Sequence, residues 1–166
     1  MAALALKRRF ALDTNVLIDL GERLPFAHNF RATYQAQGLA VPPTVVQELT
    51  HIAFNGSPPV CKFAFEALAN MRQWDILPFD LVSVGHGITE LDAQRLMREG
   101  VLPDDEFNDG LIVIETALAS IPILVTSDNH LLSVNPAELT RVLAECDLPP
   151  VTIYHPKALL RAIAPH

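Results

Sequence analysis

The sequence has little of what marks secreted, disulfide-bonded or membrane-spanning proteins. Its two cysteines, Cys61 and Cys146, are too few for a disulfide framework and lack metal-ligand spacing, so we expect two buried thiols in a reducing cytosol. The longest apolar stretch, GLIVIETALASIPILV, is interrupted by Glu115 and Pro122 and is shorter than a membrane span. The basic residues at 7–9 follow a short apolar run, the reverse of a secretory signal. These absences predict a cytoplasmic protein without membrane contact.

Positive charge is scarce as well. The 166 residues include 12 Lys and Arg against 19 Asp and Glu, which gives a net charge of −7 at pH 7. This balance argues against broad electrostatic capture of nucleic acid, which depends on Lys and Arg displacing counterions. It leaves a nucleic acid open as a substrate, because acids that bind a metal contribute to the same total.

Apolar residues are abundant and are arranged in short periodic segments. Half of the residues are hydrophobic, and a chain of this length can bury about 70% of its unfolded surface, so we expect one domain over residues 1–166. Five β-rich runs alternate with helical patterns, which predicts a three-layer α/β fold: a mostly parallel sheet of about five strands flanked by helices. Strands are expected at 8–13, 39–42, 75–79, 121–128 and 151–155, and helices beginning near 15, 26, 44, 59, 89, 104, 136 and 156.

Local signals predict the ends of two of these helices. Thr44, with Gln47 three residues later, has the pattern of a capping box, so we expect Thr44 to be an N-cap. Thr89 and Gly100 mark the two ends of another helix. The glycines of SVGHG, at 83–87, predict a loop before that helix.

Two of the predicted strands end in an aspartate, Asp13 after FAL and Asp128 after ILVTS. In an open parallel α/β sheet, ligands bind at the carboxyl ends of the strands, so these side chains are candidates for a binding site. A helix N-cap or a turn is the more common role for either aspartate taken alone.

Two further acids occur on helix faces that are otherwise apolar. Glu48 shares a stripe with Val45 and Leu49, and Asp109 shares a face with Ile112. Burying an unpaired ionised carboxylate is costly, so such a group needs an Arg partner, hydrogen bonds, a raised pKa or a metal. Asp109 has a milder explanation, because the first turn of a helix favours negative charge.

Four inward-facing acids at one end of a sheet would repel one another unless a cation lies between them. Oxygen ligands alone suit Mg²⁺ or Mn²⁺. Zinc is disfavoured, because no His or Cys pair has zinc-like spacing. His51 and His130 are near two of the acids in sequence, and we expect a surface or capping role for each.

Four segments carry these acids in the order ALDTNVLIDL, VPPTVVQEL, NDGLIVIETAL and ILVTSDNHL, and together they resemble the motif blocks of PIN-domain ribonucleases. The resemblance is strongest to the VapC-type toxins of prokaryotic toxin–antitoxin pairs. It spans nearly the whole chain, since VTIYHPKALL is similar to the last strand and helix of that family.

The resemblance implies a metal-dependent endoribonuclease that hydrolyses RNA phosphodiester bonds and acts as the toxin of a toxin–antitoxin pair. Its implied partners are an RNA substrate, an antitoxin protein and a second copy of the chain in a homodimer. One or two Mg²⁺ or Mn²⁺ ions would activate the water that attacks the phosphodiester. The resemblance assigns the catalytic and metal-binding roles to Asp13, Glu48, Asp109 and Asp128.

Residues beside these four acids carry smaller expectations. Asn15 and Thr126 would orient ligands or water, and a plain helix cap is an equal alternative for Asn15. One of the acids at 104–106 could support the site from three or four residues before Asp109, although a solvated helical turn is favoured there. The segment at 80–104 is longer than in compact members of the family, so its contribution to a substrate groove is open.

Two other functions fit parts of the same pattern. A PIN-like domain without activity would serve as an RNA- or protein-binding module, but such a domain has little reason to keep four inward acids. A phosphohydrolase with a nucleophilic aspartate would match the start of DTNVLIDL, which superficially resembles the haloacid dehalogenase motif. The second aspartate of that motif is Asn15 here, and no matching lysine motif stands out. The sequence therefore favours the nuclease.

Overall fold

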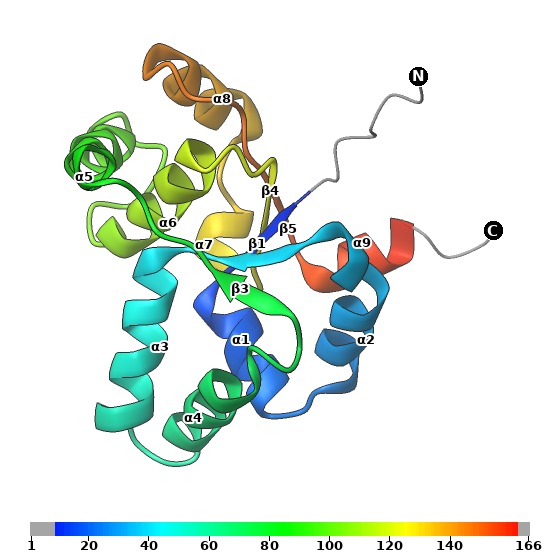
Figure 1. The fold of residues 1–166 in the computed structure, drawn as a ribbon. Helices are drawn as coiled ribbons and strands as arrows, with labels where there is room; N and C mark the ends of the chain where they lie inside the picture. The colour runs from blue at the N-terminus through cyan, green and yellow to red at the C-terminus, as the bar shows by residue number, and fades with distance from the viewer. Residues whose placement is uncertain (1–8, 163–166) are drawn as a thin grey trace.

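The computed structural model describes residues 9–162, in which five short strands form one sheet (Figure 1). The strands are β1 (Phe10–Leu12), β2 (Leu39–Val41), β3 (Ile76–Pro78), β4 (Ile123–Val125) and β5 (Thr152–Tyr154). Their order is β3-β2-β1-β4-β5, and every pairing is parallel. All residues of the three central strands are buried, as expected when helices cover both faces of a parallel sheet.

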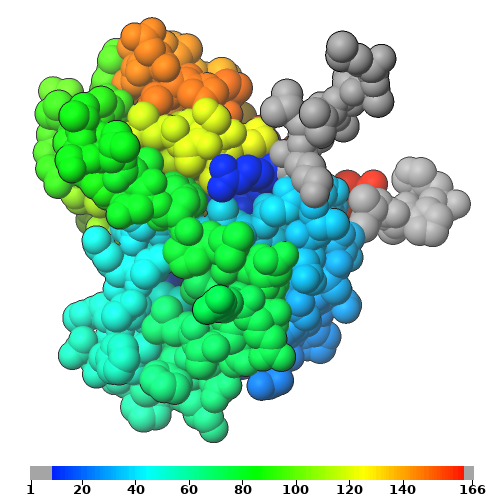
Figure 2. Space-filling model, viewed as in Figure 1, coloured from blue at the N-terminus to red at the C-terminus, as the bar shows by residue number. Residues whose placement is uncertain are grey.

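Helices lie on both sides of this sheet and confirm the predicted three-layer α/β fold. They are α1 (Thr14–Gly21), α2 (Pro25–Tyr34), α3 (Pro43–Asn55), α4 (Val60–Asn70), α5 (Ser83–Arg98), α6 (Phe107–Leu118), α7 (Asn129–Leu132), α8 (Pro136–Glu145) and α9 (Pro156–Ala162), with a 3-10 turn η1 at Gln35–Gln37. α1, α3 and α4 pack together, and α5 packs on α6 with α8 beside it. In the space-filling view, α5 and α8 form the upper part of the surface and α3 and α4 the lower part (Figure 2).

One hydrophobic core joins the sheet to the helices. Phe10 of β1 contacts Phe30 and Tyr34 of α2, with ring centroids 6.1 and 4.9 Å apart. α6 is buried on nearly every side, as its sequence predicts. Gly110 suits this position although glycine disfavours helices, because a Cβ there would lie only 3.2 Å from the Cβ of Ala93 on α5.

The strand order reverses between β1 and β4. The chain runs outward from β1 through β2 to β3, and then returns to the other side of β1 for β4 and β5. Ligands of open α/β sheets bind at such a switch point, outside the carboxyl ends of the strands. Asp13 follows β1, and its backbone N–H donates to the Val125 carbonyl at the end of β4, 2.9 Å away. The fold therefore places the ends of both aspartate-terminated strands side by side.

For α3 and α5, the predicted N-terminal ends of the helices are wrong. α3 begins before Thr44, and Thr44 donates to Glu115 of α6 instead of capping its own helix. α5 begins at Ser83, so the glycine-containing SVGHG segment is helical rather than a loop. Thr89 lies inside α5, where its hydroxyl donates to the Gly85 carbonyl at 2.7 Å, and both residues are buried. Tertiary contacts, which a local pattern does not contain, decide both cases.

The expectation of two buried thiols is also only partly met. Cys61 and Cys146 are free but half-buried, because Cys61 lies in the first turn of α4 and Cys146 at the C-terminal end of α8. Within residues 9–162, the helices lack the length and apolar character needed for crossing a membrane. Residues 7 and 8 of the N-terminal basic group lie outside the described residues.

Candidate active site

Asp13 is both a helix cap and an inward-facing acid. Its Oδ1 accepts a hydrogen bond from the backbone N–H of Thr14 at 2.7 Å, which caps α1. Its Oδ2 accepts one from the Thr126 hydroxyl at 2.7 Å. Burial raises the pKa of Asp13, the two hydrogen bonds oppose this shift, and the charge of Asp128 adds to it. The two roles that the sequence left open for Asp13 are therefore combined in one residue.

Asp109 is the least satisfied of the four acids. It lies in the first turn of α6 and is 8% exposed, and its Oδ2 atom is buried without a hydrogen-bond partner among the described residues. Burial raises the pKa of Asp109 to about 8. The negative charges of Asp13, Asp128 and Glu106 add to the shift, and so does a hydrogen bond with Glu106 that favours the protonated form. Buried polar atoms without partners are rare and costly, so this oxygen is a candidate ligand atom for a cation.

Glu48 reaches the same region from α3. It is half-buried, and its Oε1 accepts a hydrogen bond from the Thr14 hydroxyl at 3.2 Å. Burial raises the pKa of Glu48 to about 7, and the charge of Asp13 adds to the shift. Two neighbours on its predicted stripe, Val45 and Leu49, are fully buried, which confirms the face assigned from the sequence.

Asp128 follows β4 and caps the short helix α7. Its Oδ1 accepts a hydrogen bond from the backbone N–H of His130 at 2.8 Å. The side chain is half-buried, and its charge raises the pKa values of both Asp13 and Asp109. The four acids predicted from the sequence thus lie near enough to act on one another through their charges, around the ends of β1 and β4.

Thr126 and Asn15 position this end of the sheet. The Thr126 hydroxyl is fully buried, donates to Asp13 and accepts from the backbone N–H of Asp128 at 2.9 Å, so one side chain fixes two acids. Asn15 lies inside α1, and its Oδ1 accepts from the Ser127 N–H at 3.2 Å. The alternative role of Asn15 as a helix cap is wrong, because Asp13 occupies that position.

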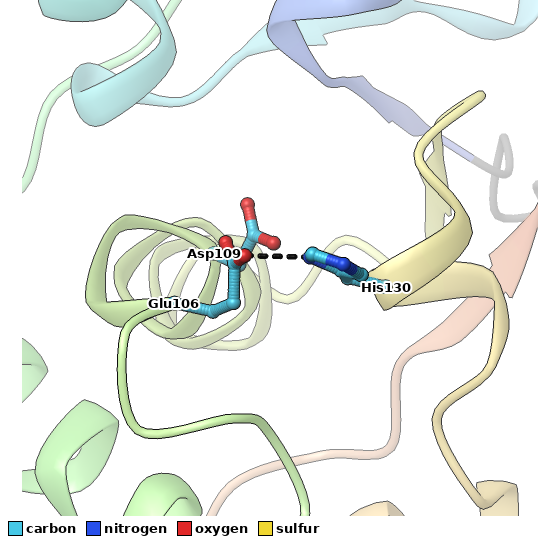
Figure 3. A group of neighbouring side chains, drawn as sticks. All are labelled: Glu106, Asp109 and His130. Carbon is cyan, nitrogen blue, oxygen red and sulfur yellow. Dashed lines mark hydrogen bonds and ion pairs between the residues drawn. The ribbon is translucent and has the colours of Figure 1, made fainter.

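A histidine and a further acid lie beside Asp109, and the sequence pattern did not join them. His130 Nδ1 is 2.6 Å from Glu106 Oε1, and one ligand atom from each of Glu106, Asp109 and His130 lies within 4.8 Å of the other two (Figure 3). Of the four predicted acids, Asp109 alone belongs to this compact group. Glu106 stands three residues before Asp109, a spacing that was visible in the sequence. His130 lies 24 residues from Glu106, so its proximity depends on the fold.

Glu115 is a buried acid that the sequence showed only as a break in an apolar run. It is 3% exposed, and its two carboxylate oxygens accept from the Thr44 N–H at 3.0 Å and the Thr44 hydroxyl at 2.9 Å. Burial raises the pKa of Glu115, and the two hydrogen bonds oppose the shift. Since both oxygens have donors, Glu115 links α6 to α3 and differs from Asp109.

A cleft opens next to Glu48, between α3 and the start of α6. Its volume is about 330 Å³, within the range of small-ligand pockets. Amide, imidazole and aliphatic groups line it, without a Lys or Arg side chain: Thr44, Gln47, Glu48, His51, Ile52 and Asn108. The lining offers neutral hydrogen-bonding groups beside the acids. His51, expected on the surface, is exposed and lines this cleft.

The donor set fits a hard divalent cation. Carboxylates are the ligands that Mg²⁺ and Mn²⁺ prefer, and the Oδ2 of Asp109, which has no hydrogen-bond partner among residues 9–162, is a candidate ligand atom. The raised pKa values of Asp109 and Glu48 reflect burial and the negative charge of Asp13, both of which a bound cation would offset. Such a centre can polarise a phosphate oxygen and activate water.

The sequence matches no family model and no curated protein, whereas its fold matches solved structures. VapBC2 from Rickettsia felis, bound to a DNA fragment from its promoter, aligns with a TM-score of 0.61 at 15% identity, covering 89% of this chain and 98% of the other. VapBC-1 from nontypeable Haemophilus influenzae, at 2.2 Å resolution, aligns with a TM-score of 0.56 at 16% identity, covering 90% and 98%. The chain therefore has the VapC-like PIN fold that its four motif blocks predicted.

Proposed function

We propose that the protein is a metal-dependent endoribonuclease that hydrolyses RNA phosphodiester bonds and acts as the toxin of a toxin–antitoxin pair. The observation that carries the proposal is the buried, partnerless Oδ2 of Asp109 among the charges of Asp13, Asp128 and Glu106. A structural acid would have a donor there, as Glu115 has in Thr44. A buried oxygen without a donor lowers the stability of the fold, and a metal-binding role explains why the protein has one.

Each of the four acids has a proposed role in metal binding. Asp13, Glu48 and Asp109 would hold the ion, and Asp128 would act from a second or outer position. Bound Mg²⁺ or Mn²⁺ supplies an activated water and neutralises charge on the phosphate oxygens. Thr126 keeps Asp13 and Asp128 in place through its two hydrogen bonds, so these acids need little reorganisation when the ion binds.

The RNA strand would enter through the cleft between α3 and α6. Gln47, His51 and Asn108 present hydrogen-bonding groups to a nucleotide there, next to Glu48. The lining has no Lys or Arg, and the whole chain carries a net charge of −7. Phosphate contacts would therefore depend on the metal, and RNA binding should depend only weakly on salt concentration.

Exposed apolar side chains support protein partners for this chain. The rings of Phe54 on α3 and Phe65 on α4 contact each other, with centroids 6.3 Å apart, although these residues are 70% and 52% exposed. Val84, Ile88 and Leu91 form an exposed stripe on α5. Large apolar patches on a protein surface commonly mark interaction sites. We propose an antitoxin and a second copy of the chain as the partners that cover them, in the cytoplasm where the RNA substrate is found.

Cleavage of a mixed pool of structured RNAs by the purified protein tests this function. The pool is incubated with EDTA, Mg²⁺ or Mn²⁺, and Asp109→Asn is assayed in parallel after its folding is verified by a thermal melt. The proposal predicts metal-dependent cleavage by the wild type and none by the folded variant. Absence of cleavage, together with no metal-induced rise in melting temperature, would favour the alternative of a catalytically inactive binding module.

A further inference from the structure

An imidazole nitrogen lies at the edge of the proposed metal centre, where the sequence predicted oxygen ligands alone. His130 comes from the start of α7 and Glu106 from the residue before α6, and their side chains approach to 2.6 Å. Together with Asp109 they offer three ligand atoms within 4.8 Å of one another (Figure 3). Ligands about 2.1 Å from one ion lie at most about 4.2 Å apart, so a small side-chain adjustment would bring all three onto one cation.

The buried Asp109 separates this group from an ordinary surface pair. Asp109 is 8% exposed, and its Oδ2 lacks a hydrogen-bond partner among the described residues. A second histidine–carboxylate pair, His86 and Asp80, has a similar distance of 2.9 Å. Both of its members are exposed, and the buried acid near them, Glu115, has a hydrogen-bond donor for each of its oxygens. Of the two pairs, therefore, only Glu106–His130 adjoins a buried carboxylate that has an oxygen without a hydrogen-bond partner among the described residues.

We propose that Glu106, Asp109 and His130 form a mixed oxygen and nitrogen subsite that makes the centre prefer first-row transition ions such as Mn²⁺ and Co²⁺ over Mg²⁺. This inference rests on the metal centre of the proposed function and adds its ion selectivity. Mg²⁺ favours oxygen ligands and keeps several waters, whereas an imidazole ligand favours transition ions. His130 is exposed, so an ion at this point would remain open to water and to a phosphate oxygen.

Metal affinities of His130→Gln test the subsite without any activity assay. Dissociation constants for Mn²⁺, Co²⁺ and Mg²⁺ are measured by calorimetry on the wild type, on this variant and on the matched control His86→Gln, with thermal melts to confirm folding. We expect His130→Gln to weaken Mn²⁺ and Co²⁺ binding by at least about tenfold and Mg²⁺ binding by less than about twofold. The control should bind all three ions as the wild type does.

A second variant separates the two proposals. An unchanged ratio of Mn²⁺ to Mg²⁺ affinity in His130→Gln would overturn the subsite. If Asp109→Asn loses metal binding in that case, the proposed metal centre stands without the histidine. If Asp109→Asn binds metal as the wild type does, the proposed centre itself is wrong.

Discussion

Two acid-rich regions of the molecule differ in whether their carboxylates are paired with arginines. Between α5 and α8, Glu99, Glu138 and Glu145 surround Arg141, whose guanidinium nitrogens lie 2.8 Å from each of them. Arg95 joins the same network through Glu99 and Glu145. At the ends of β1 and β4, Asp13, Asp109 and Asp128 accept hydrogen bonds from neutral groups or from none. We call the first region the α5–α8 ion-pair network.

The pKa values show what this difference means. Arg141 and Arg95 lower the pKa of Glu99 in the network, whereas burial and neighbouring acids raise the pKa of Asp109 to about 8. Acids in the network are paired by the protein itself. Acids at the sheet end lack that compensation, so either protonation or a bound cation would relieve their repulsion. The pairing of acids, rather than their number, is therefore what indicates function.

The largest effect is expected from removing charge at the sheet end. Asp13→Asn and Asp109→Asn should each lower RNA cleavage by more than about 100-fold, because each removes a metal ligand. Asp109→Asn should also raise the melting temperature in EDTA, since it removes a buried charge whose Oδ2 has no hydrogen-bond donor among the described residues. Asp13→Asn should raise it less, because an amide cannot accept both hydrogen bonds of Asp13. Cleavage assays and melts on both variants check this ranking, and retained activity in either one would remove that residue from the site.

The next largest effect is a pH dependence of stability in the absence of metal. A carboxyl whose pKa is raised on folding binds its proton more tightly in the folded state, so the free energy of unfolding falls as pH rises. For Asp109 this fall runs from about pH 4, near its unfolded pKa of 3.8, to its folded pKa of about 8. Glu48 adds a fall that ends near pH 7.

Urea denaturation between pH 4 and 9 in EDTA measures this slope. Asp109→Asn should flatten it between pH 7 and 8, and Mn²⁺ should restore wild-type stability most strongly near pH 8, because the metal replaces the proton. Arg141→Gln, in the ion-pair network, should keep the wild-type slope between pH 7 and 8. A wild-type slope in Asp109→Asn would show that Asp109 ionises freely in the folded protein.

A smaller effect is expected from the hydroxyl that holds two acids. Thr126→Val keeps the side-chain shape but removes the hydrogen bonds to Asp13 and Asp128, which should lower activity by about tenfold and the free energy of unfolding by about 1–3 kcal/mol. Thr116→Val is the matched control, because Thr116 is equally buried and its hydroxyl donates to the Ile112 carbonyl within α6. Equal activities of the two variants would show that Thr126 does not position the site.

The smallest effect is expected in the ion-pair network. Arg141→Gln should lower the melting temperature slightly at low salt, and 1 M NaCl should remove the difference, because its partners are exposed and screened. RNA cleavage should stay within about twofold of the wild type, as exposed ion pairs contribute little beyond their own neighbourhood. A large loss of activity would show that α5 and α8 contribute to the substrate site.

The sequence supported those predictions whose physical cause is local. A buried strand that ends in aspartate, or a carboxylate on an apolar helix face, is visible in a few neighbouring residues, which is how Asp13, Glu48 and Asp109 were found. The bond between Thr44 and Glu115 joins residues 71 apart, and the contact between Glu106 and His130 joins residues 24 apart. Such partners depend on how α3, α6 and α7 meet. The same limit explains why α5 begins earlier than predicted. Packing that buries Gly85 and Thr89 stabilises the helix more than the low helix propensity of its glycines destabilises it.

The central claim is that a divalent ion binds at the carboxyl ends of β1 and β4. A crystal soaked in Mn²⁺ and measured for anomalous scattering tests it most directly. We expect a peak at about 2.2 Å from an Asp109 oxygen, with an Asp13 oxygen as a second ligand. The same soak of Asp109→Asn crystals should give no peak. An empty site in the wild type, or a peak that survives in Asp109→Asn, would contradict the claim.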